Sequence, residues 1–426
     1  MTGSLFGIFF SLMLLAGSPL VICMVMASLV VLFMFTDVPA VVVPQRMFVM
    51  LDSFPLMAVP YFVLAGVIME QGGISTRLVE LAKALVGHLQ GGIALVTVLA
   101  MMVFSGLSGS GTADIAAIGS IMIPALIARG YTRGYAAALL GASGALGPII
   151  PPSIIMILYA ALVNQSPAKM FLGGILPGIL IGVGMMAICW VQARKMGIGS
   201  EPRVPWPGKF RAIAASGWAL GMPVLVLGGI VAGVFTATEA GIAAVVYALI
   251  VGLFIHREIT FADLPRLLYS AAYTTTVVMV IVGAAGIFAW LLAIGQAPMV
   301  VRQALLSITD EPFLAALIVV IFLIIAGGFM DIAALIVLFV PVLHPLGEFF
   351  GYDGLQWAVT LSIALVIGGV TPPVADFLFI SAAMAKATLR EATRHVWPFL
   401  WWMIFVNVLC LIAPGLTLWL PGLLMP

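Results

Sequence analysis

Apolar runs long enough to cross a lipid bilayer recur along nearly the whole chain, from Leu5 to Leu420. A transmembrane helix needs about 20 consecutive apolar residues, and only short polar stretches separate these runs. Of the 426 residues, 64% are apolar and 8% are charged, whereas globular domains have about 45–50% and about 25%. The sequence therefore predicts an all-α polytopic membrane protein without a soluble domain.

Charge and motif content exclude several other classes of protein. The net charge is +1, so no strong electrostatic field indicates nucleic acid as a partner. Cys23, Cys189 and Cys410 lie singly in apolar runs, which argues against a disulfide framework and a metal cluster. The chain has no HExxH, GxSxG or phosphate-binding GxxxxGKS/T motif, so we expect neither a membrane enzyme nor an ATP-hydrolysing pump. The alternative that a separate partner chain supplies an ATPase stays open.

Charges, glycines and prolines divide the apolar runs into about ten spans and two interrupted stretches. The interrupted stretches, about 94–127 and 312–345, have breaks near Ser108–Asp114 and near Gly327–Asp331. Each predicts a re-entrant helical hairpin, because non-helical backbone at membrane depth must be covered by protein or by a water-filled cavity. We expect the transmembrane spans at about 4–19, 20–36, 54–71, 134–164, 170–191, 217–235, 239–255, 270–294, 356–385 and 397–420.

The basic residues favour one orientation of these spans. If the segment after residue 72 is cytoplasmic, only Arg46, Lys169 and Arg302 of the 17 Lys and Arg residues lie outside. This orientation opens the first hairpin to the inside and the second to the outside. The side of the N-terminus stays open, because residues 17–19 either separate two spans or kink one.

Residues 75–92 place Leu78, Leu81, Leu85 and Leu89 near one face of a helix, with polar residues elsewhere. The pattern is typical of a helix that lies in the membrane interface. An ordinary connecting helix packed on the bundle fits the pattern equally well.

The two interrupted stretches resemble each other in sequence. Asp114–Ile118 (DIAAI) recurs as Asp331–Leu335 (DIAAL), and a proline, Pro124 or Pro341, follows each Asp by ten residues. Because the two hairpins open to opposite sides, the copies are expected to be related by inversion in the membrane plane. Inverted repeats of this kind are typical of secondary transporters.

Each hairpin is followed by a span that glycine and a double proline interrupt, at Gly147–Pro152 (GPIIPP) and at Gly368–Pro373 (GGVTPP). Proline lacks the N–H that a helix needs, so carbonyl groups near these breaks are free to face a cation. Simple proline kinks are the alternative, and the paired arrangement of the breaks makes this alternative weaker.

Three carboxylates, Asp114, Asp331 and Asp376, lie in otherwise apolar runs. A carboxylate in the middle of the membrane costs about 2.5–3.5 kcal/mol, so each is a candidate for a functional site. Asp114 and Asp331 also follow the hairpin tips, where an Asp can cap the returning helix. We expect capping to matter more at Asp114 than at Asp331.

Hydroxyl groups are concentrated at the first hairpin tip, where Ser108, Ser110 and Thr112 alternate with glycines. Glycine lets the backbone approach a ligand closely, although small residues also serve tight helix packing. Glu239 lies at a turn between two spans. It could serve a proton step, but a helix cap fits its position better.

These motifs resemble the large membrane subunit of the tripartite ATP-independent periplasmic (TRAP) transporters along nearly the whole chain. The family usually has a proline where Ala237 stands. The matching segments are Ser53–Leu56, Pro60–Phe62, Leu85–His88, Gly91–Gly92, Ser108–Asp114, Gly130–Tyr131, Gly147–Ser153 and Thr238–Ala240.

The resemblance implies a sodium-driven elevator transporter in the bacterial cytoplasmic (inner) membrane that imports a small organic anion. A periplasmic substrate-binding protein would deliver the anion, and a small four-helix membrane subunit would assist. Na⁺ would be the co-transported ion, with no organic cofactor. By resemblance, the sodium sites match Ser108, Ser110, Gly147, Gly327, Gly328 and Thr371. The substrate site matches Ser110, Ser153 and Asp331, with Thr112, Asp114 and Asp376 as possible additions.

The repeats also predict a division of the chain into five parts. Residues 1–93 and 165–311 would supply scaffold and arm helices, and 386–426 a C-terminal scaffold helix. Residues 94–164 and 312–385 would be the two transport repeats. A sodium- or proton-coupled anion symporter without a binding protein is the main alternative, and a channel fits two opposed hairpins less well. The sequence does not select among carboxylates, keto acids, sugar acids and sulfonates as substrates.

Overall fold

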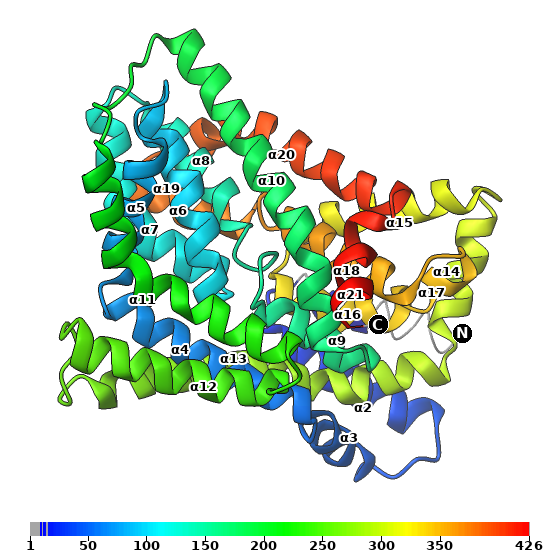
Figure 1. Ribbon diagram of the computed structural model, residues 1–426. Helices are drawn as coiled ribbons and strands as arrows, with labels where there is room; N and C mark the ends of the chain where they lie inside the picture. Colours follow the sequence, from blue (N-terminus) through cyan, green and yellow to red (C-terminus); the bar gives the residue numbers. More distant parts are fainter. Residues whose placement is uncertain (1–8, 11, 14–15, 426) are drawn as a thin grey trace.

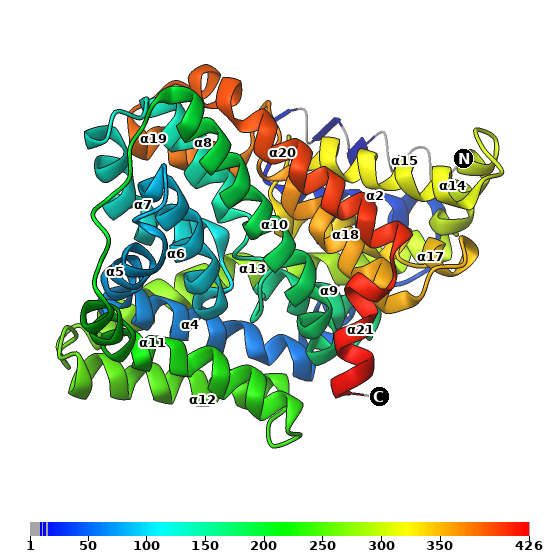
Figure 2. The same cartoon turned by 45° about the horizontal axis from the view of Figure 1, so that its top comes forward.

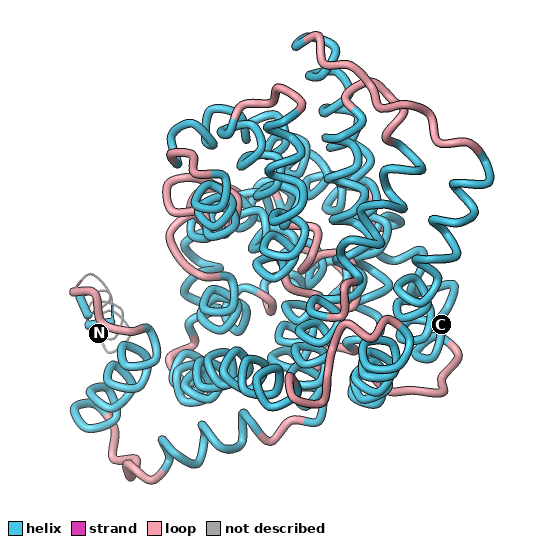
Figure 3. Tube along the Cα trace, turned by 90° about the vertical axis from the view of Figure 1, so that its left-hand side faces the viewer, coloured by secondary structure: helices cyan, strands magenta, loops and turns pink. Residues whose placement is uncertain are grey.

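The computed structural model describes residues 9–10, 12–13 and 16–425, and every regular element in them is helical (Figure 3). Half of the predicted span at 4–19 lies outside these residues. The helices up to residue 196 are α2 (Leu20–Phe35), α3 (Val42–Leu51), η1 (Phe54–Met57), α4 (Ala58–Gln71), α5 (Ile74–Val86), α6 (Gly92–Ser108), α7 (Gly111–Ala128), α8 (Arg133–Gly144), α9 (Ile154–Val163) and α10 (Pro167–Met196). Those after it are α11 (Trp206–Val231), α12 (Ala237–Ile250), η2 (Val251–Ile255), α13 (Leu264–Ile294), α14 (Ala297–Leu306), α15 (Pro312–Gly327), α16 (Ile332–Leu343), α17 (Leu346–Phe349), α18 (Gly354–Gly368), α19 (Asp376–Ala385), α20 (Leu389–Ile412) and α21 (Gly415–Leu424).

The helical, polytopic character of the chain is confirmed. Among the described residues, seven helical segments are long and apolar enough to cross a membrane. They are Phe54–Gln71, Gly111–Ala128, Pro167–Met196, Trp206–Val231, Ala237–Ile255, Leu264–Ile294 and Leu389–Ile412. Shorter apolar helices accompany them, among them α9, α18 and α19.

One predicted span is divided in the structure, and two short helices were not predicted. The span predicted at 397–420 is two helices, because α20 ends at Ile412 and α21 begins at Gly415, after Pro414. No sequence signal indicated α3 and α14, which have ten residues each and are too short to cross the bilayer. Figure 1 shows α3 below α2 at the edge of the molecule.

The two predicted hairpins are present, as α6–α7 and α15–α16, and each packs against the broken span that follows it. The first broken span is α8 and α9, and the second is α18 and α19. The second half of each broken span packs on the other repeat: α9 contacts α16 and α18, whereas α19 contacts α7 and α8. The two repeats are therefore interlocked, and neither can be displaced alone without losing these contacts.

The remaining helices form a frame beside the repeats. Helices α4 and α12 lie side by side along the lower edge in Figures 1 and 2. Helix α13 packs against α2, α3 and α4 of the frame and also against α16 of the second hairpin. We call α2–α4 and α11–α13 the frame.

Two long helices predicted with the scaffold, α10 and α20, contact the repeats. Helix α20 packs against α8 and α18, and α10 packs against α6, α9 and α18. Both run diagonally across the molecule in Figures 1 and 2. Their packing therefore associates α10 and α20 with the repeats. The division into moving and fixed helices stays a prediction.

Helix α5 contacts α6 of the first hairpin and α11 of the frame. Leu78 and Leu81 are buried as expected, but Leu85 is 39% exposed and Leu89, beyond the end of the helix, is 42% exposed. Arg77 on α5 forms an ion pair of 2.7 Å with Glu258. The packing indicates that α5 is a connecting helix packed on the bundle, and not a helix that lies in the membrane interface.

Candidate functional site

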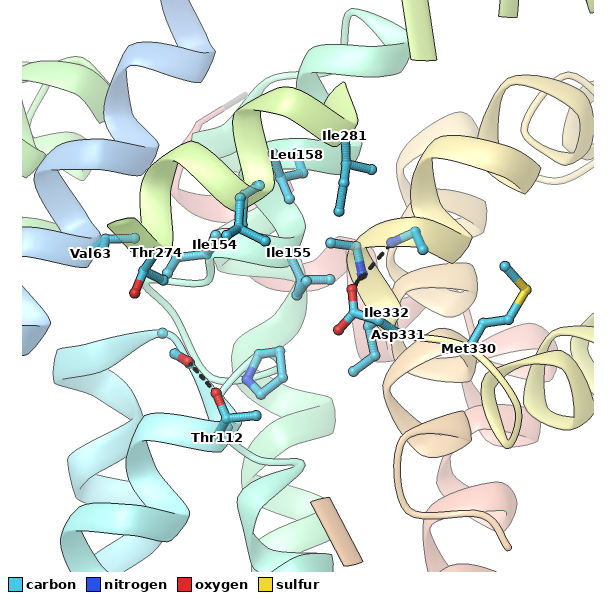
Figure 4. A pocket seen from close by; sticks show the side chains of 18 of the residues that line it. Val63, Thr112, Ile154, Ile155, Leu158, Thr274, Ile281, Met330, Asp331 and Ile332 are labelled. Atoms are coloured by element: carbon cyan, nitrogen blue, oxygen red, sulfur yellow. Dashed lines mark hydrogen bonds between the residues drawn. The ribbon is translucent and has the colours of Figure 1, made fainter. Parts of the chain in front are cut away.

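The tips of both hairpins line one cavity of about 650 Å³. From the first hairpin come Gly109, Ser110, Gly111 and Thr112, and from the second Phe329 to Ala334. Figure 4 shows Thr112 and Asp331 on opposite sides of this cavity, with Ile155 of α9 between them. The structure thus brings together residues that lie more than 200 positions apart in the sequence.

The first tip is a tight turn built on glycine. Helix α6 ends at Ser108, Gly109 follows with a left-handed φ of +63°, and α7 begins at Gly111. The amide of Ile154 donates to the carbonyl oxygen of Gly109 at 3.4 Å, which ties the tip to the broken span. A Cβ atom at Gly109 would overlap the carbonyl oxygen of Pro152. Only glycine fits here, because both the φ angle and the close approach exclude a side chain.

Asp114 lies behind this tip and is fully buried. Its carboxylate accepts hydrogen bonds from the hydroxyl of Ser105 at 3.0 Å and from the hydroxyl of Ser108. A Cβ atom at Gly147 would lie 2.5 Å from Oδ2 of Asp114, so the broken span passes directly over the carboxylate. Ser105, Ser108, Asp114 and Gly147 therefore form one polar cluster within an apolar surrounding. Asp114 does not line the cavity.

At the second tip the broken span also packs closely on the hairpin, here through backbone atoms. The amide of Val374 donates to the carbonyl oxygen of Gly328 at 2.9 Å. A Cβ atom at Gly328 would lie 3.0 Å from the carbonyl oxygen of Thr371 and 3.1 Å from that of Pro372. Gly327 approaches Gly368 so closely that its Cβ atom would lie 2.5 Å from the Cα atom of Gly368. Carbonyl oxygens of the broken span thus converge on Gly328, and the Thr371 hydroxyl donates to the carbonyl of Ile367.

The roles expected for the two repeated Asp residues are reversed in the structure. Asp331 precedes α16 and caps it, accepting from the amides of Ala333 at 2.9 Å and Ala334 at 3.3 Å. Asp114 is the fourth residue of α7 and caps nothing; its partners are side-chain hydroxyls. The prediction that capping matters more at Asp114 was therefore wrong. Asp331 is exposed to the cavity and combines the cap with a position in its wall.

The other predicted site residues differ in their positions. Ser110 and Thr112 line the cavity, and their hydroxyls lie 3.2 Å apart. Ser153 is buried and does not line the cavity: it caps α9 by accepting from the amide of Met156, and it donates to the carbonyl of Pro148 at 2.6 Å. Asp376 begins α19 and is partly buried outside the cavity. Glu239 forms a capping box with Thr236, as its sequence position indicated.

Several cavity residues were missed by sequence reasoning. Phe377 of α19 packs against Gly111 at the first tip and Gly369 of the second broken span, so it contacts both repeats. One signal could have indicated α13: the hydroxyl run from Tyr273 to Thr276 inside a long apolar helix. The other missed wall residues carry only apolar side chains: Val63, Ile154, Ile155, Leu158, Val277, Val278 and Ile281.

The chain is similar to known proteins along nearly its whole length. The model of the family described as "tripartite ATP-independent periplasmic transporter, DctM component" matches residues 6–416. The chain is 38% identical to the isethionate TRAP transporter permease protein DctMQ of Oleidesulfovibrio alaskensis, over 98% of this chain and 66% of that protein. It is also 38% identical to the 2,3-diketo-L-gulonate TRAP transporter large permease protein YiaN of Escherichia coli, over 86% of each.

The fold is also similar to that of a solved structure, described as the Alcanivorax borkumensis YdaH transporter with an unusual topology. The TM-score is 0.56, with 15% sequence identity and coverage of 91% of this chain and 90% of that one. At this identity the likeness concerns the fold alone. The match to the family model covers nearly the whole chain, and the chain therefore belongs to the DctM component family of tripartite ATP-independent periplasmic transporters.

Proposed function

We propose that this chain is the large membrane subunit of a sodium-coupled importer of a small organic anion in the bacterial cytoplasmic membrane. A periplasmic binding protein delivers the anion, and a small four-helix membrane subunit completes the complex. The observation that carries this proposal is the convergence of both hairpin tips and both broken spans on one cavity. Paired broken helices of this kind are how secondary transporters hold a substrate and its coupling ion together.

Sodium is the expected coupling ion because hard oxygen ligands surround both tips. At the first tip these are the hydroxyls of Ser105 and Ser108, the carboxylate of Asp114 and the backbone beside Gly147. At the second they are the carbonyl oxygens of Thr371 and Pro372 beside Gly328. Carbonyl and hydroxyl oxygens at unwound helix ends are typical sodium ligands in transporters.

The organic anion is placed at the cavity end of α7. No side chain caps the first turn of α7, so its amide groups are available to an anion, and the Ser110 and Thr112 hydroxyls adjoin them. Across the cavity, only Oδ1 of Asp331 is used for capping. Oδ2 of Asp331 is thus available to accept a hydrogen bond from a hydroxyl or amino group of the substrate. The relatives transporting isethionate and 2,3-diketo-L-gulonate, by their names, support an organic acid as the substrate class.

The interlocked repeats support an elevator movement. Because α9 and α19 each pack on the opposite repeat, the cavity would come apart if one repeat moved alone. The repeats would therefore shift together against the frame and carry the tips across the membrane.

The test is uptake into proteoliposomes that contain the purified two-subunit complex, with the cognate binding protein and its ligand outside. We expect uptake to require an inward sodium gradient and to persist without ATP. Equally fast uptake driven by a pH gradient without sodium would refute sodium coupling. Equally fast uptake without the binding protein would favour a symporter that works alone.

A further inference from the structure

Glu70 is an unexplained carboxylate on the frame. It lies one residue before the end of α4 and is partly buried. It forms no hydrogen bond or ion pair with any residue in the part of the chain that the structure describes, although its neighbour Gln71 accepts from Arg266. An ionisable group within a transmembrane helix is costly unless it has a function or a partner.

The face of α4 that carries Glu70 packs along the first hairpin. Val63, Gly66 and Glu70 are spaced by three and four residues and so lie on one side of the helix. Val63 lines the cavity beside the hairpin tip. A Cβ atom at Gly66 would lie 3.4 Å from the Cα atom of Ser108 and 3.5 Å from its carbonyl oxygen. Glu70 lies one turn further along the same face, and Ser108 in turn donates to the Asp114 carboxylate.

We propose that Glu70 is the contribution of the frame to cation binding at the first hairpin tip. Negative charges on Glu70 and Asp114 repel each other in a low-dielectric surrounding, and a cation held by the Asp114 cluster would remove this repulsion. Cation binding would therefore favour the docking of the hairpin on α4 that is seen here, and docking would strengthen cation binding. This proposal rests on the proposed function, because it takes the cation to be sodium.

The position of Glu70 has a consequence for the transport cycle. Asp114 belongs to the hairpin, whereas Glu70 belongs to the frame, so an elevator movement would separate the two carboxylates. Glu70 would then strengthen sodium binding in one end state and have no effect in the other. A ligand shifts a conformational equilibrium only by its difference in affinity for the two states, and Glu70 would supply such a difference.

The test measures sodium binding separately from transport, in the two-subunit complex in lipid nanodiscs. The melting temperature is followed against NaCl, with choline chloride keeping the ionic strength constant. We expect Glu70→Gln to raise the sodium concentration for half-maximal stabilisation by about tenfold, the order expected for loss of one nearby charge. Glu70→Asp keeps the charge and should stay within about threefold of the parent. The matched control is Glu80→Gln on α5, where Glu80 is exposed and 3.9 Å from Lys83, and this change should leave the sodium response unaltered.

Three outcomes would count against the proposal, and they are distinguishable. If the parent complex is stabilised by sodium and Glu70→Gln has the same half-maximal concentration, the role of Glu70 is refuted while sodium coupling stands. If Glu70→Asp shifts the response as far as Glu70→Gln, the charge is not what matters. If the parent itself does not respond to sodium, the proposed function fails with it.

Discussion

Replacing Gly147 with Ala tests whether the close packing of the first broken span on the Asp114 cluster is needed for transport. The added Cβ atom would lie 2.5 Å from Oδ2 of Asp114, 2.7 Å from the amide nitrogen of Gly111 and 2.9 Å from the Cα atom of Gly111. Non-bonded carbon atoms prefer about 3.5–4.0 Å, so the hairpin tip must retreat by about 1 Å. Two of the three opposing atoms are backbone, which cannot rotate away as a flexible side chain can.

Overpacking of this kind costs about 1–3 kcal/mol. We expect Gly147→Ala to lower the melting temperature by several degrees and to lower sodium-driven uptake at least tenfold, since about 1.4 kcal/mol in a binding step is a factor of ten. The assays are thermal unfolding of the complex in nanodiscs and uptake per folded molecule. Gly217→Ala in α11, where nothing lies within 4 Å of the new Cβ atom, is the matched control. It should keep full uptake and equal or higher stability, because Ala favours a helix over Gly by about 1 kcal/mol.

The second repeat offers a graded version of the same experiment. A Cβ atom at Gly328 would meet the carbonyl oxygens of Thr371 and Pro372 at 3.0 and 3.1 Å, which is tight but less severe than at Gly147. Gly328→Ala should therefore fall between Gly147→Ala and Gly217→Ala in both assays. If Gly147→Ala kept the melting temperature, uptake and sodium dependence of the parent, the assignment of this contact to the transport site would have to be abandoned.

Three further predictions concern the second hairpin, a peripheral cap and the movement of the repeats. Asp331→Asn should retain folding, because Asn also caps helices, yet abolish uptake through loss of the cavity carboxylate; equal uptake per folded molecule would refute this role. Glu239→Gln weakens an exposed capping box and should lower the melting temperature only slightly, with uptake per folded molecule unchanged. Gly106→Cys with Pro223→Cys places the new Cβ atom of residue 106 at 3.9 Å from that of residue 223, joining α6 to the frame helix α11, so oxidation should stop uptake and reduction restore it. The control pair, Gly173→Cys with Val359→Cys, has the same 3.9 Å spacing and joins α10 to α18. Full uptake with the pair at residues 106 and 223 completely oxidised would favour local gating over an elevator.

The hairpins and broken spans could be predicted because their signals are local. Glycine and proline interrupt apolar runs wherever the backbone leaves a helix, and these interruptions occur at Ser108–Gly111, Gly147–Pro152 and Gly368–Pro373. The pairing of α9 with α16, and of α19 with α7, had no such signal. These helices are apolar on nearly all sides, so hydrophobic periodicity does not select which neighbour they contact. The α13 wall of the cavity was missed although the hydroxyl run from Tyr273 to Thr276 marked it.

The reversed roles of Asp114 and Asp331 show where a sequence repeat ceases to predict structure. At the first tip Gly109 takes a left-handed conformation, the turn is short, and α7 already begins at Gly111, three residues before Asp114. At the second tip α15 ends at Gly327 and the chain runs on to Asp331 before α16 begins. The same DIAA motif therefore starts inside one helix and at the cap of the other. Capping depends on the residue at which a helix begins, and a motif match alone does not supply that residue.

This difference between the tips gives the two repeats different chemistry. Asp114 is turned away from the cavity into a cluster of hydroxyls and close backbone, which suits a dehydrated cation. Asp331 is held at the cavity wall by the helix that it caps, which suits a contact with a polar group of the substrate. Two hairpins with equal turns would place both Asp residues alike, so the unequal turns account for the different positions of Asp114 and Asp331. Lengthening the first turn by one residue should therefore weaken both the stabilisation by sodium and uptake, because Asp114 would lose its place beside Ser108 and Gly147 and the Ser110 and Thr112 hydroxyls would shift with it.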